Sequence, residues 1–374
     1  MHRSSLFRIS RPGGARAWFS AALVLLHFQT SAQVLEEWTY QSPSESSAAV
    51  RMDGKYMFVA ENEHEVLRLF EQRPRARCAP PVYSFDARPF LNLSSANPEV
   101  DIEAAAAIQH QGTKLICWLG SHGHSRNNQS RPNRSRLFGT RVLGDGTGAA
   151  PFTLAYAGRY EHLRDDLLAW DRDNRHGKGS NYFQLSASAA PDVSPEAVDG
   201  FNIEGFCVAP DGTAAYIAFR APLVNGSGPT TAWHQRTNAL IVSLLNPAEL
   251  AAGNFTSGRG RAKFGVPVTL NLGRRGIRSL DSSFPNQYLI VAGPVNETSN
   301  PPRAPLDFRL FTWTGDFTNQ PVARVTRFPH GYEPEGAVLP PSLLSEDAVV
   351  QFVSDDSTTC WNSFTTRVGA AGQR

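Results

Sequence analysis

Charged residues recur at the start of short apolar segments, in a pattern that could bring several of them to one site. Glu103, Glu204 and Glu335 each stand at the start of such a segment, and Arg278 takes the equivalent place in another. A charged group beside an apolar strand is costly to desolvate unless it is paired or metal-bound. The pattern therefore predicts that these four side chains have charged partners.

Further polar residues recur where the chain returns from each segment. A turn and a second apolar run follow, and this run ends in Ser121-His122, Arg220 or Ser354-Asp355. In an antiparallel hairpin the start of the first strand lies beside the end of the second. We therefore expect one shared funnel that holds a ligand-binding set and a metal-binding set. The ligand-binding set is Glu103, His122, Glu204, Arg220 and Arg278, and the metal-binding set is Glu335 and Asp355.

Three kinds of chemistry fit such a funnel. The arginines could pair with the carboxylates in a structural ring. A divalent cation could take the Glu and Asp oxygens, as Ca²⁺ does with 6 to 8 ligands. A small anionic ligand could bridge a cation and the arginines. The sequence contains no G-x-S-x-G elbow, H-E-x-x-H helix or P-loop, so covalent catalysis is disfavoured.

The elements that would position these residues are repeated hairpins. Starts at about 48, 102, 203, 277 and 335 are each followed by further strand candidates, which gives units of roughly four strands, as in a propeller blade. We expect an all-β chain with a single β-propeller domain over residues 33–374, built from five or six blades. The stretch from Val34 to Tyr40 is expected to close the last blade.

The segment from about 159 to 201 could be a sixth blade or an insertion. Leu163, Leu167 and Trp170 are spaced as on one face of a helix, which favours a short helical insertion near 160–175. Asp165, Asp166, Asp171 and Asp173 are expected to lie on a solvated face of that helix and at its end.

The motifs at these hairpins carry a resemblance over nearly the whole chain after residue 32. They are Asp101-Ile102-Glu103, Asn202-Ile203-Glu204-Gly205, Gly276-Ile277-Arg278 and Pro334-Glu335-Gly336. In this order they resemble the bacterial domain-of-unknown-function 3616 family, which is itself similar to secreted phytase-like, esterase-like propellers. The resemblance implies the fold and no defined activity. Two positions depart from the family pattern, because Ala104 replaces the usual Gly and the usual Asp after the Ile-Arg pair is displaced to Asp281.

The first 32 residues have the order of a signal peptide. Four arginines precede the apolar run from Trp18 to Phe28, and Thr30, Ser31 and Ala32 follow it. The run is shorter than the roughly 20 residues that span a bilayer. We expect a secreted or periplasmic protein with no membrane span once residues 1–32 are removed.

Charge and cysteine content limit the remaining possibilities. The 36 Lys and Arg nearly balance the 34 Asp and Glu, which argues against a nucleic-acid partner. We expect a monomer. Cys117 and Cys207 lie in apolar runs and should be buried thiols. Cys78 and Cys360 lie in turn-rich stretches near the two ends of the predicted domain, and could form a disulfide in an oxidising compartment.

These observations leave three hypotheses. The first is a propeller that binds a cation or small anionic ligand in its funnel. The second is a metal-dependent phosphoesterase, in which Ca²⁺ or another divalent cation activates water while Arg220 and Arg278 hold the phosphate. The third is a structural or protein-interaction propeller. Under the first two, Glu204→Gln and Arg278→Ala should weaken binding and leave the protein folded, whereas unfolding would favour a structural ring.

Overall fold

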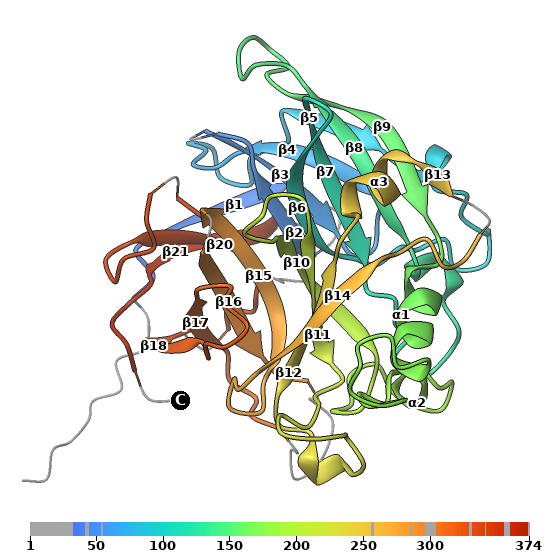
Figure 1. Cartoon of the computed structure of the whole chain (residues 1–374). Helices are drawn as coiled ribbons and strands as arrows, with labels where there is room; N and C mark the ends of the chain where they lie inside the picture. Colours follow the sequence, from blue (N-terminus) through green and yellow to red (C-terminus); the bar gives the residue numbers. More distant parts are fainter. Residues whose placement is uncertain are drawn as a thin grey trace, which may run out of the picture.

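The computed structural model is a five-bladed β-propeller (Figure 1). It describes residues 33–41, 45–53, 55–255, 258–284, 286–295, 304–328, 331–340, 342–354 and 360–372. The predicted signal peptide, residues 1–32, lies outside this range. Five sheets, four with four strands and one with five, pack around a common axis, and each begins with an inner strand. The predicted hairpin starts all fall within two residues of an inner strand, so the propeller prediction is confirmed with five blades.

The first two blades occupy the N-terminal half of the chain. Blade 1 runs outwards through β2 (Ser46–Arg51), β3 (Tyr56–Glu61), β4 (Val66–Glu71) and β5 (Tyr83–Asp86). Blade 2 runs through β6 (Ile102–His110), β7 (Thr113–Gly120), β8 (Leu137–Leu143) and β9 (Thr153–Tyr160), and the short β13 (Asn254–Phe255) adds to its outer edge in parallel.

The remaining blades follow in chain order. Blade 3 is β10 (Asn202–Val208), β11 (Ala215–Ala221), β12 (Ala239–Leu244) and β14 (Phe264–Leu270). Blade 4 is β15 (Gly276–Phe284), β16 (Gln287–Gly293), β17 (Arg309–Trp313) and β18 (Val322–Arg327). Blade 5 is β19 (Pro334–Val338), β20 (Val349–Ser354), β21 (Cys360–Arg367) and β1 (Glu36–Gln41).

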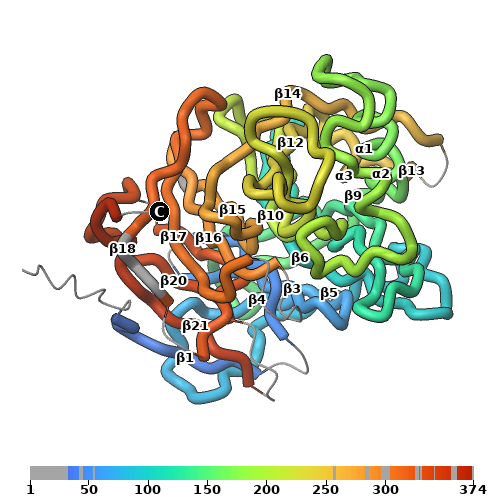
Figure 2. The backbone as a smooth tube through the Cα atoms, turned by 90° about the horizontal axis from the view of Figure 1, so that it is seen from below, coloured from blue at the N-terminus to red at the C-terminus, as the bar shows by residue number. Residues whose placement is uncertain are grey.

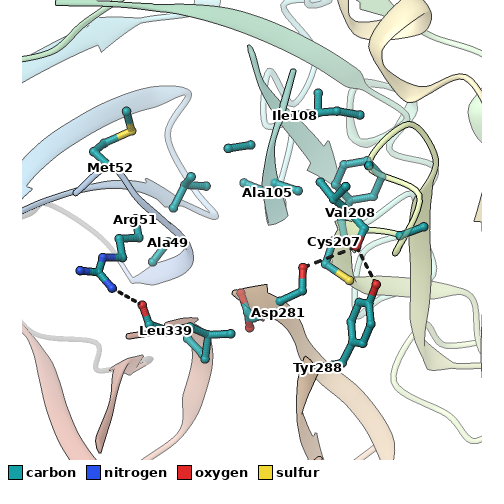
Figure 3. A pocket seen from close by; sticks show the side chains of 18 of the residues that line it. Ala49, Arg51, Met52, Ala105, Ile108, Cys207, Val208, Asp281, Tyr288 and Leu339 are labelled. Carbon is teal, nitrogen blue, oxygen red and sulfur yellow. Dashed lines mark hydrogen bonds between the residues drawn. The ribbon is translucent and has the colours of Figure 1, made fainter. Parts of the chain in front are cut away.

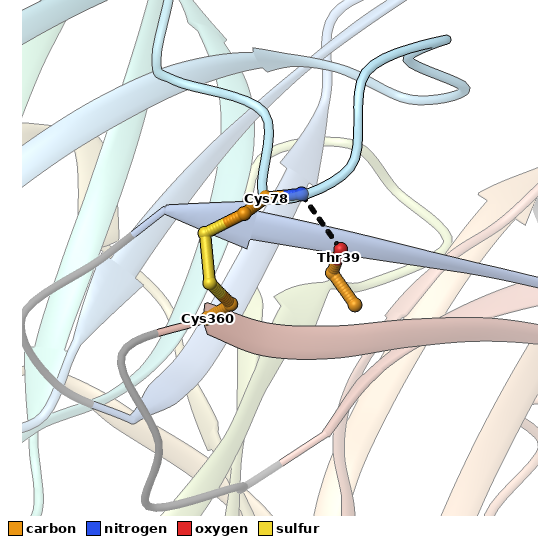
Figure 4. The surroundings of a disulfide bond; sticks show 3 residues. All are labelled: Thr39, Cys78 and Cys360. Carbon is orange, nitrogen blue, oxygen red and sulfur yellow. Dashed lines mark hydrogen bonds between the residues drawn. A yellow bond between two sulfur atoms is a disulfide. The ribbon is translucent and has the colours of Figure 1, made fainter.

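The N-terminal strand closes the ring, as the sequence predicts. β1 pairs with β21 in antiparallel register from Glu36↔Thr365 to Gln41↔Cys360, so the last blade contains both ends of the domain (Figure 2). Cys78 and Cys360 form a disulfide beside this junction, with Cα atoms 5.5 Å apart (Figure 4). The backbone N–H of Cys78 also donates to Oγ1 of Thr39 at 2.8 Å. Strand pairing and a covalent bond therefore both hold the closure.

The segment between blades 2 and 3 is a helical insertion, as predicted. α1 (Leu163–Arg172) buries Leu163, Leu167 and Trp170 against the core, and α2 (Leu185–Ser188) lies beside it. A third helix, α3 (Pro247–Ala252), packs on β8 and β9 (Figure 1). Three short 3₁₀ turns complete the secondary structure, at Arg88–Phe90, Pro132–Arg134 and Trp233–Gln235.

The prediction of a solvated acidic helix face is wrong for two of its four residues. Asp166 is buried and accepts hydrogen bonds from the backbone of Gly260 at 2.6 Å and of Ala262 at 3.0 Å. Asp171 is buried and accepts from the backbone of Phe183 and of Leu185. Both carboxylates accept hydrogen bonds from loop N–H groups, and those of Ala262, Phe183 and Leu185 belong to buried residues that need such a partner.

The core consists of apolar layers between neighbouring blades rather than one central cluster. Cys117 and Cys207 are buried within these layers as free thiols, as expected. None of the helices in the described ranges is long and apolar enough to cross a membrane. The axis itself is lined by the five inner strands, and the candidate site lies there.

Candidate functional site

Each inner strand carries a β-bulge at the same place. In β6, Ile102 pairs with Gly120 and Ala104 pairs with Leu119, so Glu103 is the extra residue. The same slip in register occurs near the start of β2, β10, β15 and β19. We call the five extra residues the bulge ring, and they are Ser47, Glu103, Glu204, Arg278 and Glu335.

The bulges explain why charged residues can occupy the start of otherwise apolar strands. A bulge bends the strand locally and re-aims one side chain without shifting the register of the rest of the pair. All five ring residues line the same polar cavity. Because each inner strand packs against the next, their order around the axis is the blade order. The bulge ring is thus one side chain per blade around a shared funnel.

Arg278 bridges its two ring neighbours. Its Nε lies 2.8 Å from Oε2 of Glu204 and 3.1 Å from Oε2 of Glu335, and its Nη2 contacts Oε1 of Glu335. All three side chains are buried. One guanidinium therefore joins blades 3, 4 and 5.

Glu204 has two further partners within its own blade. Nη1 of Arg220, from the end of β11, donates to Oε1 of Glu204 at 3.0 Å, and the Asn202 amide donates to the same oxygen at 2.9 Å. Arg220 also donates through Nε to the carbonyl of Pro294 in blade 4 at 3.2 Å. The predicted convergence of a strand start with the end of its partner strand is observed here.

Glu103 has no such neighbour. It stands between Ser47 and Glu204 in the bulge ring, and no described residue forms a hydrogen bond or ion pair with its carboxylate. Burial raises the pKa of Glu103 well above its usual value, and the nearby carboxylates of Asp101, Glu204 and Glu335 raise it further. Glu103 is the ring position where a positive charge is missing.

The funnel around the ring has a volume of about 430 Å³ and is mainly acidic. Eight carboxyl and four guanidinium side chains line it. At its mouth Arg134 contacts Glu99 and lies 2.7 Å from Oδ2 of Asp101. Burial raises the pKa of Asp101 to about 6, against the opposing effect of Arg134. Asp101 also holds a left-handed backbone with φ of +57°, and strained conformations of this kind gather at functional sites.

The structure brings together five of the seven residues predicted for the funnel, which are Glu103, Glu204, Arg220, Arg278 and Glu335. His122 does not line it, which corrects the prediction. The imidazole of His122 is fully buried, and its Nδ1 lies 2.6 Å from the carbonyl oxygen of Gly120. The backbone φ of His122 is +60°. Burial lowers the pKa of His122 to about 4. The left-handed backbone at this position breaks the strand pattern on which the prediction depends.

The predicted metal ligands are only partly described. Glu335 is engaged by Arg278, and Asp355 lies outside the described residues. Over the ranges that the structure covers, no group of three or more His, Cys, Asp or Glu side chains is placed to hold a metal ion. The metal site stays a prediction.

Sequence reasoning missed Ser47, Asp101 and Arg134 among the residues of the funnel. Ser47 is the ring member of blade 1, and its hydroxyl donates to the Ala60 carbonyl at 3.3 Å and also contacts the Ile102 carbonyl. A small neutral residue gives no sign of such a position, although the spacing before Ala48 matches the other repeats. Asp101 belongs to a recognised motif and Arg134 to a loop expected on the same face of the propeller, but neither was named as a site residue.

Comparisons with known proteins identify remote structural neighbours and no family. No protein-family model and no curated protein matches the chain. Among solved structures, it is similar to glutaminyl cyclase from Myxococcus xanthus, with a TM-score of 0.41 and 10% identity over 90% of this chain and 96% of that one. It is also similar to a GH43_1 enzyme from Xanthomonas citri complexed with xylose, with a TM-score of 0.42 and 8% identity over 90% and 94% of the two chains.

A third similar structure is the PQQ-bound aldose sugar dehydrogenase from Streptomyces coelicolor, with a TM-score of 0.42 and 10% identity over 90% of this chain and 98% of that one. The names of these neighbours describe different activities. Identities and TM-scores at this level transfer neither an activity nor a site to this chain.

Proposed function

We propose that the polar funnel binds a small hydrophilic cation at Glu103. The observation that carries the proposal is the charge of the bulge ring. If ionised, Glu103, Glu204 and Glu335 bring three negative charges, which Arg278 and the adjacent Arg220 offset by two. One more positive charge would neutralise the ring. Glu103 is the ring carboxylate that no described guanidinium contacts.

An anionic ligand fits this arrangement less well. Arg220 and Arg278, which were expected to hold it, each contact a buried carboxylate. An incoming anion would have to compete with Glu204 and Glu335 for these groups, in a funnel where carboxyl groups outnumber guanidinium groups two to one. The negative carboxylates of the funnel would repel an anionic ligand. The same carboxylates would attract a cation.

The ring therefore divides into two parts with different roles. Arg278, Glu204 and Glu335 link three blades and serve the structural function that buried ion pairs can provide. Glu103 and the neighbouring Asp101 form the binding part. In this proposal the ligand replaces a proton on Glu103, because its raised pKa favours the protonated form in the absence of another cation.

The other sequence-based expectations stay proposals. The first two are that the protein is secreted or periplasmic and that it belongs to the domain-of-unknown-function 3616 family. The others are a metal ion bound by Glu335 and Asp355 and a metal-dependent phosphoesterase activity. The phosphoesterase would need Arg220 and Arg278 to leave their carboxylate partners in order to hold a phosphate. We therefore favour binding over phosphoryl transfer.

Titration calorimetry of the purified protein with Ca²⁺, Mg²⁺ and ethanolamine, each at fixed ionic strength, tests the proposal. At least one of the three should bind, and Glu103→Gln should weaken it about tenfold or more, since the substitution removes the charge and keeps the shape. Glu63→Gln is the matched control, because Glu63 lies exposed on the same funnel outside the bulge ring. It should change affinity little.

Buffers with different heats of protonation add a second readout. Cation binding should release protons from the wild type and fewer from Glu103→Gln, because the raised pKa of Glu103 favours its protonated form before the cation binds. Absence of binding by all three cations, or equal affinity of the wild type and Glu103→Gln, would refute the proposal.

A further inference from the structure

A second cavity opens on the other side of the bulge ring. It has a volume of about 750 Å³ and is formed by the later parts of the five inner strands and the turns after them. Most of its lining is apolar, as Figure 3 shows for Ala49, Met52, Ala105, Ile108, Val208 and Leu339. This volume lies within the range of small-molecule sites, which are mostly apolar with a few convergent polar groups. We call this cavity the apolar funnel.

Among the described residues, Asp53 and Asp281 are the carboxyl groups that line the apolar funnel, and Asp281 is the one carried by an inner strand. It also lines the constriction between the two funnels, next to Glu103 and Glu204. Its Oδ2 accepts a hydrogen bond from the Ser279 hydroxyl at 2.5 Å. The other charged lining residues, Arg51 and Asp53, belong to the end of β2 and its turn, and Arg51 donates to the carbonyls of Asp53 and Leu339 at 2.8 Å each.

We propose that the apolar funnel binds an amphipathic organic cation, a small molecule whose apolar body fills the cavity and whose protonated amine pairs with Asp281. The apolar walls favour a hydrocarbon body, because its burial contributes roughly 25 cal/mol per Å². Asp281 favours the amine, because a carboxylate among apolar side chains is stabilised by a charged partner. Figure 3 shows Asp281 on blade 4, opposite Ala49 and Ala105 of blades 1 and 2.

The pKa of Asp281 agrees with this geometry. Burial raises it to about 7, although the Ser279 hydroxyl and a backbone N–H of Ala337 both lower it. Two hydrogen bonds therefore do not compensate for the loss of water around the carboxylate. A buried ammonium group would supply the missing stabilisation.

The two funnels are separate sites. The space in the constriction between them is about 10 Å³, which is about the minimum for a single water molecule. No organic ligand can pass from one to the other without movement of the inner strands. The amphipathic ligand of the apolar funnel is thus distinct from the hydrophilic cation proposed at Glu103, and each proposal can fail without the other.

The experiment compares octylamine, 1-octanol and octanoate, which share a chain length and differ in the polar group. Titration calorimetry on the full chain should give the highest affinity for octylamine, at least about tenfold above 1-octanol, and the lowest for octanoate. Asp281→Asn should weaken octylamine about tenfold and leave 1-octanol unchanged. Glu63→Gln, at an exposed position of the polar funnel that touches neither the apolar funnel nor the constriction, should alter none of the three.

A second variant tests the cavity itself. Ala107 lines the apolar funnel on β6, and Ala107→Trp should fill it and abolish binding of both octylamine and 1-octanol. Thermal melting establishes that each variant is folded. The proposal is overturned if the wild type binds octylamine and 1-octanol equally or binds neither. It is also overturned if folded Asp281→Asn keeps the full affinity for octylamine, or if folded Ala107→Trp still binds it. The comparison of ligands on the wild type decides the matter even where a variant does not fold.

Discussion

Arg278 on β15 and Glu335 on β19 form a buried ion pair that joins the fourth blade to the fifth. Nε of Arg278 lies 3.1 Å from Oε2 of Glu335, and its Nη2 contacts Oε1, so the guanidinium meets the carboxylate with two nitrogens. The same Nε lies 2.8 Å from Glu204 of the third blade. Such forked contacts are short, specific and stronger than single neutral hydrogen bonds.

Removal of this arginine should therefore destabilise the propeller, contrary to the sequence-based expectation for Arg278→Ala. In Arg278→Met, the carboxylates of Glu204 and Glu335 lose the cation between them, and breaking a buried pair in this way costs about 3–5 kcal/mol. Denaturant unfolding of the wild type and variant measures the difference. Arg278→Lys should recover only part of the loss, because an ammonium group cannot make the forked contact.

Arg88→Met is the control for this comparison. Arg88 pairs with Asp86 at 2.6 Å on the surface, where both side chains are more than 40% exposed. Surface pairs of this kind contribute about 0–1 kcal/mol. Equal unfolding free energies for Arg278→Met and Arg88→Met would show that the bridge does not hold the blades together.

The buried carboxylate of Asp166 should stabilise the helical insertion. Asp166→Ala leaves the N–H groups of Gly260 and Ala262 and the hydroxyl of Tyr160 without their acceptor. The N–H of Ala262 and the hydroxyl of Tyr160 are buried, and each unsatisfied buried donor costs about 1–3 kcal/mol, so we expect a clear drop in the midpoint of chemical unfolding. Asp165→Ala is the matched control one residue earlier, since its carboxylate is 41% exposed and pairs with the exposed Arg259. A similar small effect for both substitutions would contradict this role.

The acids of the insertion also show where sequence reasoning stops. Asp165 and Asp166 are adjacent and chemically identical, and both suit a solvated helix surface. What distinguishes them is a loop from residues 258–262, nearly a hundred positions away, in which the backbone N–H groups of Gly260 and Ala262 donate to Asp166. Local spacing carries no information about such a partner.

The inner strands were predictable for the opposite reason. Each has a local signature, a motif followed by an apolar run, a turn and a second apolar run, and five copies of it imply blades before any contact is known. The charged members of the bulge ring were found because Glu or Arg is conspicuous there. Ser47 was missed because it is small and neutral, and the apolar funnel because its alanines and valines resemble ordinary blade packing.

The disulfide between Cys78 and Cys360 should stabilise the closure of the ring. It links blade 1 to blade 5 across 282 positions of the sequence, and a link of that span removes much of the freedom of the unfolded chain. Reduction should lower the melting temperature, in line with a loss of about 2–5 kcal/mol. The double variant Cys78→Ser/Cys360→Ser should match the reduced wild type and show no further response to reductant. A melting temperature that reductant leaves unchanged would mean that the β1–β21 pairing alone closes the propeller.

Asp281 should make the stability of the protein depend on pH in a predictable direction. Its pKa rises from 3.8 to about 7 on folding because burial disfavours the carboxylate. The folded state then binds the proton more tightly than the unfolded state, so the stabilisation is fully present below about pH 4. It is lost as the pH rises towards 7, at up to about 1.4 kcal/mol per pH unit.

Asp281→Asn removes this proton and keeps the shape of the side chain. Relative to the wild type, the variant should therefore gain stability steadily between pH 4 and 7 and keep a constant difference above that range. Urea unfolding of both proteins from pH 4 to 8 gives the difference directly, and the raised pKa values of Glu103 and Asp101 affect both proteins alike and cancel. A difference that stays constant across the whole range would show that Asp281 is ionised in the folded protein at every pH tested. The carboxylate would then already have the stabilising partner that the apolar funnel is proposed to obtain from its ligand.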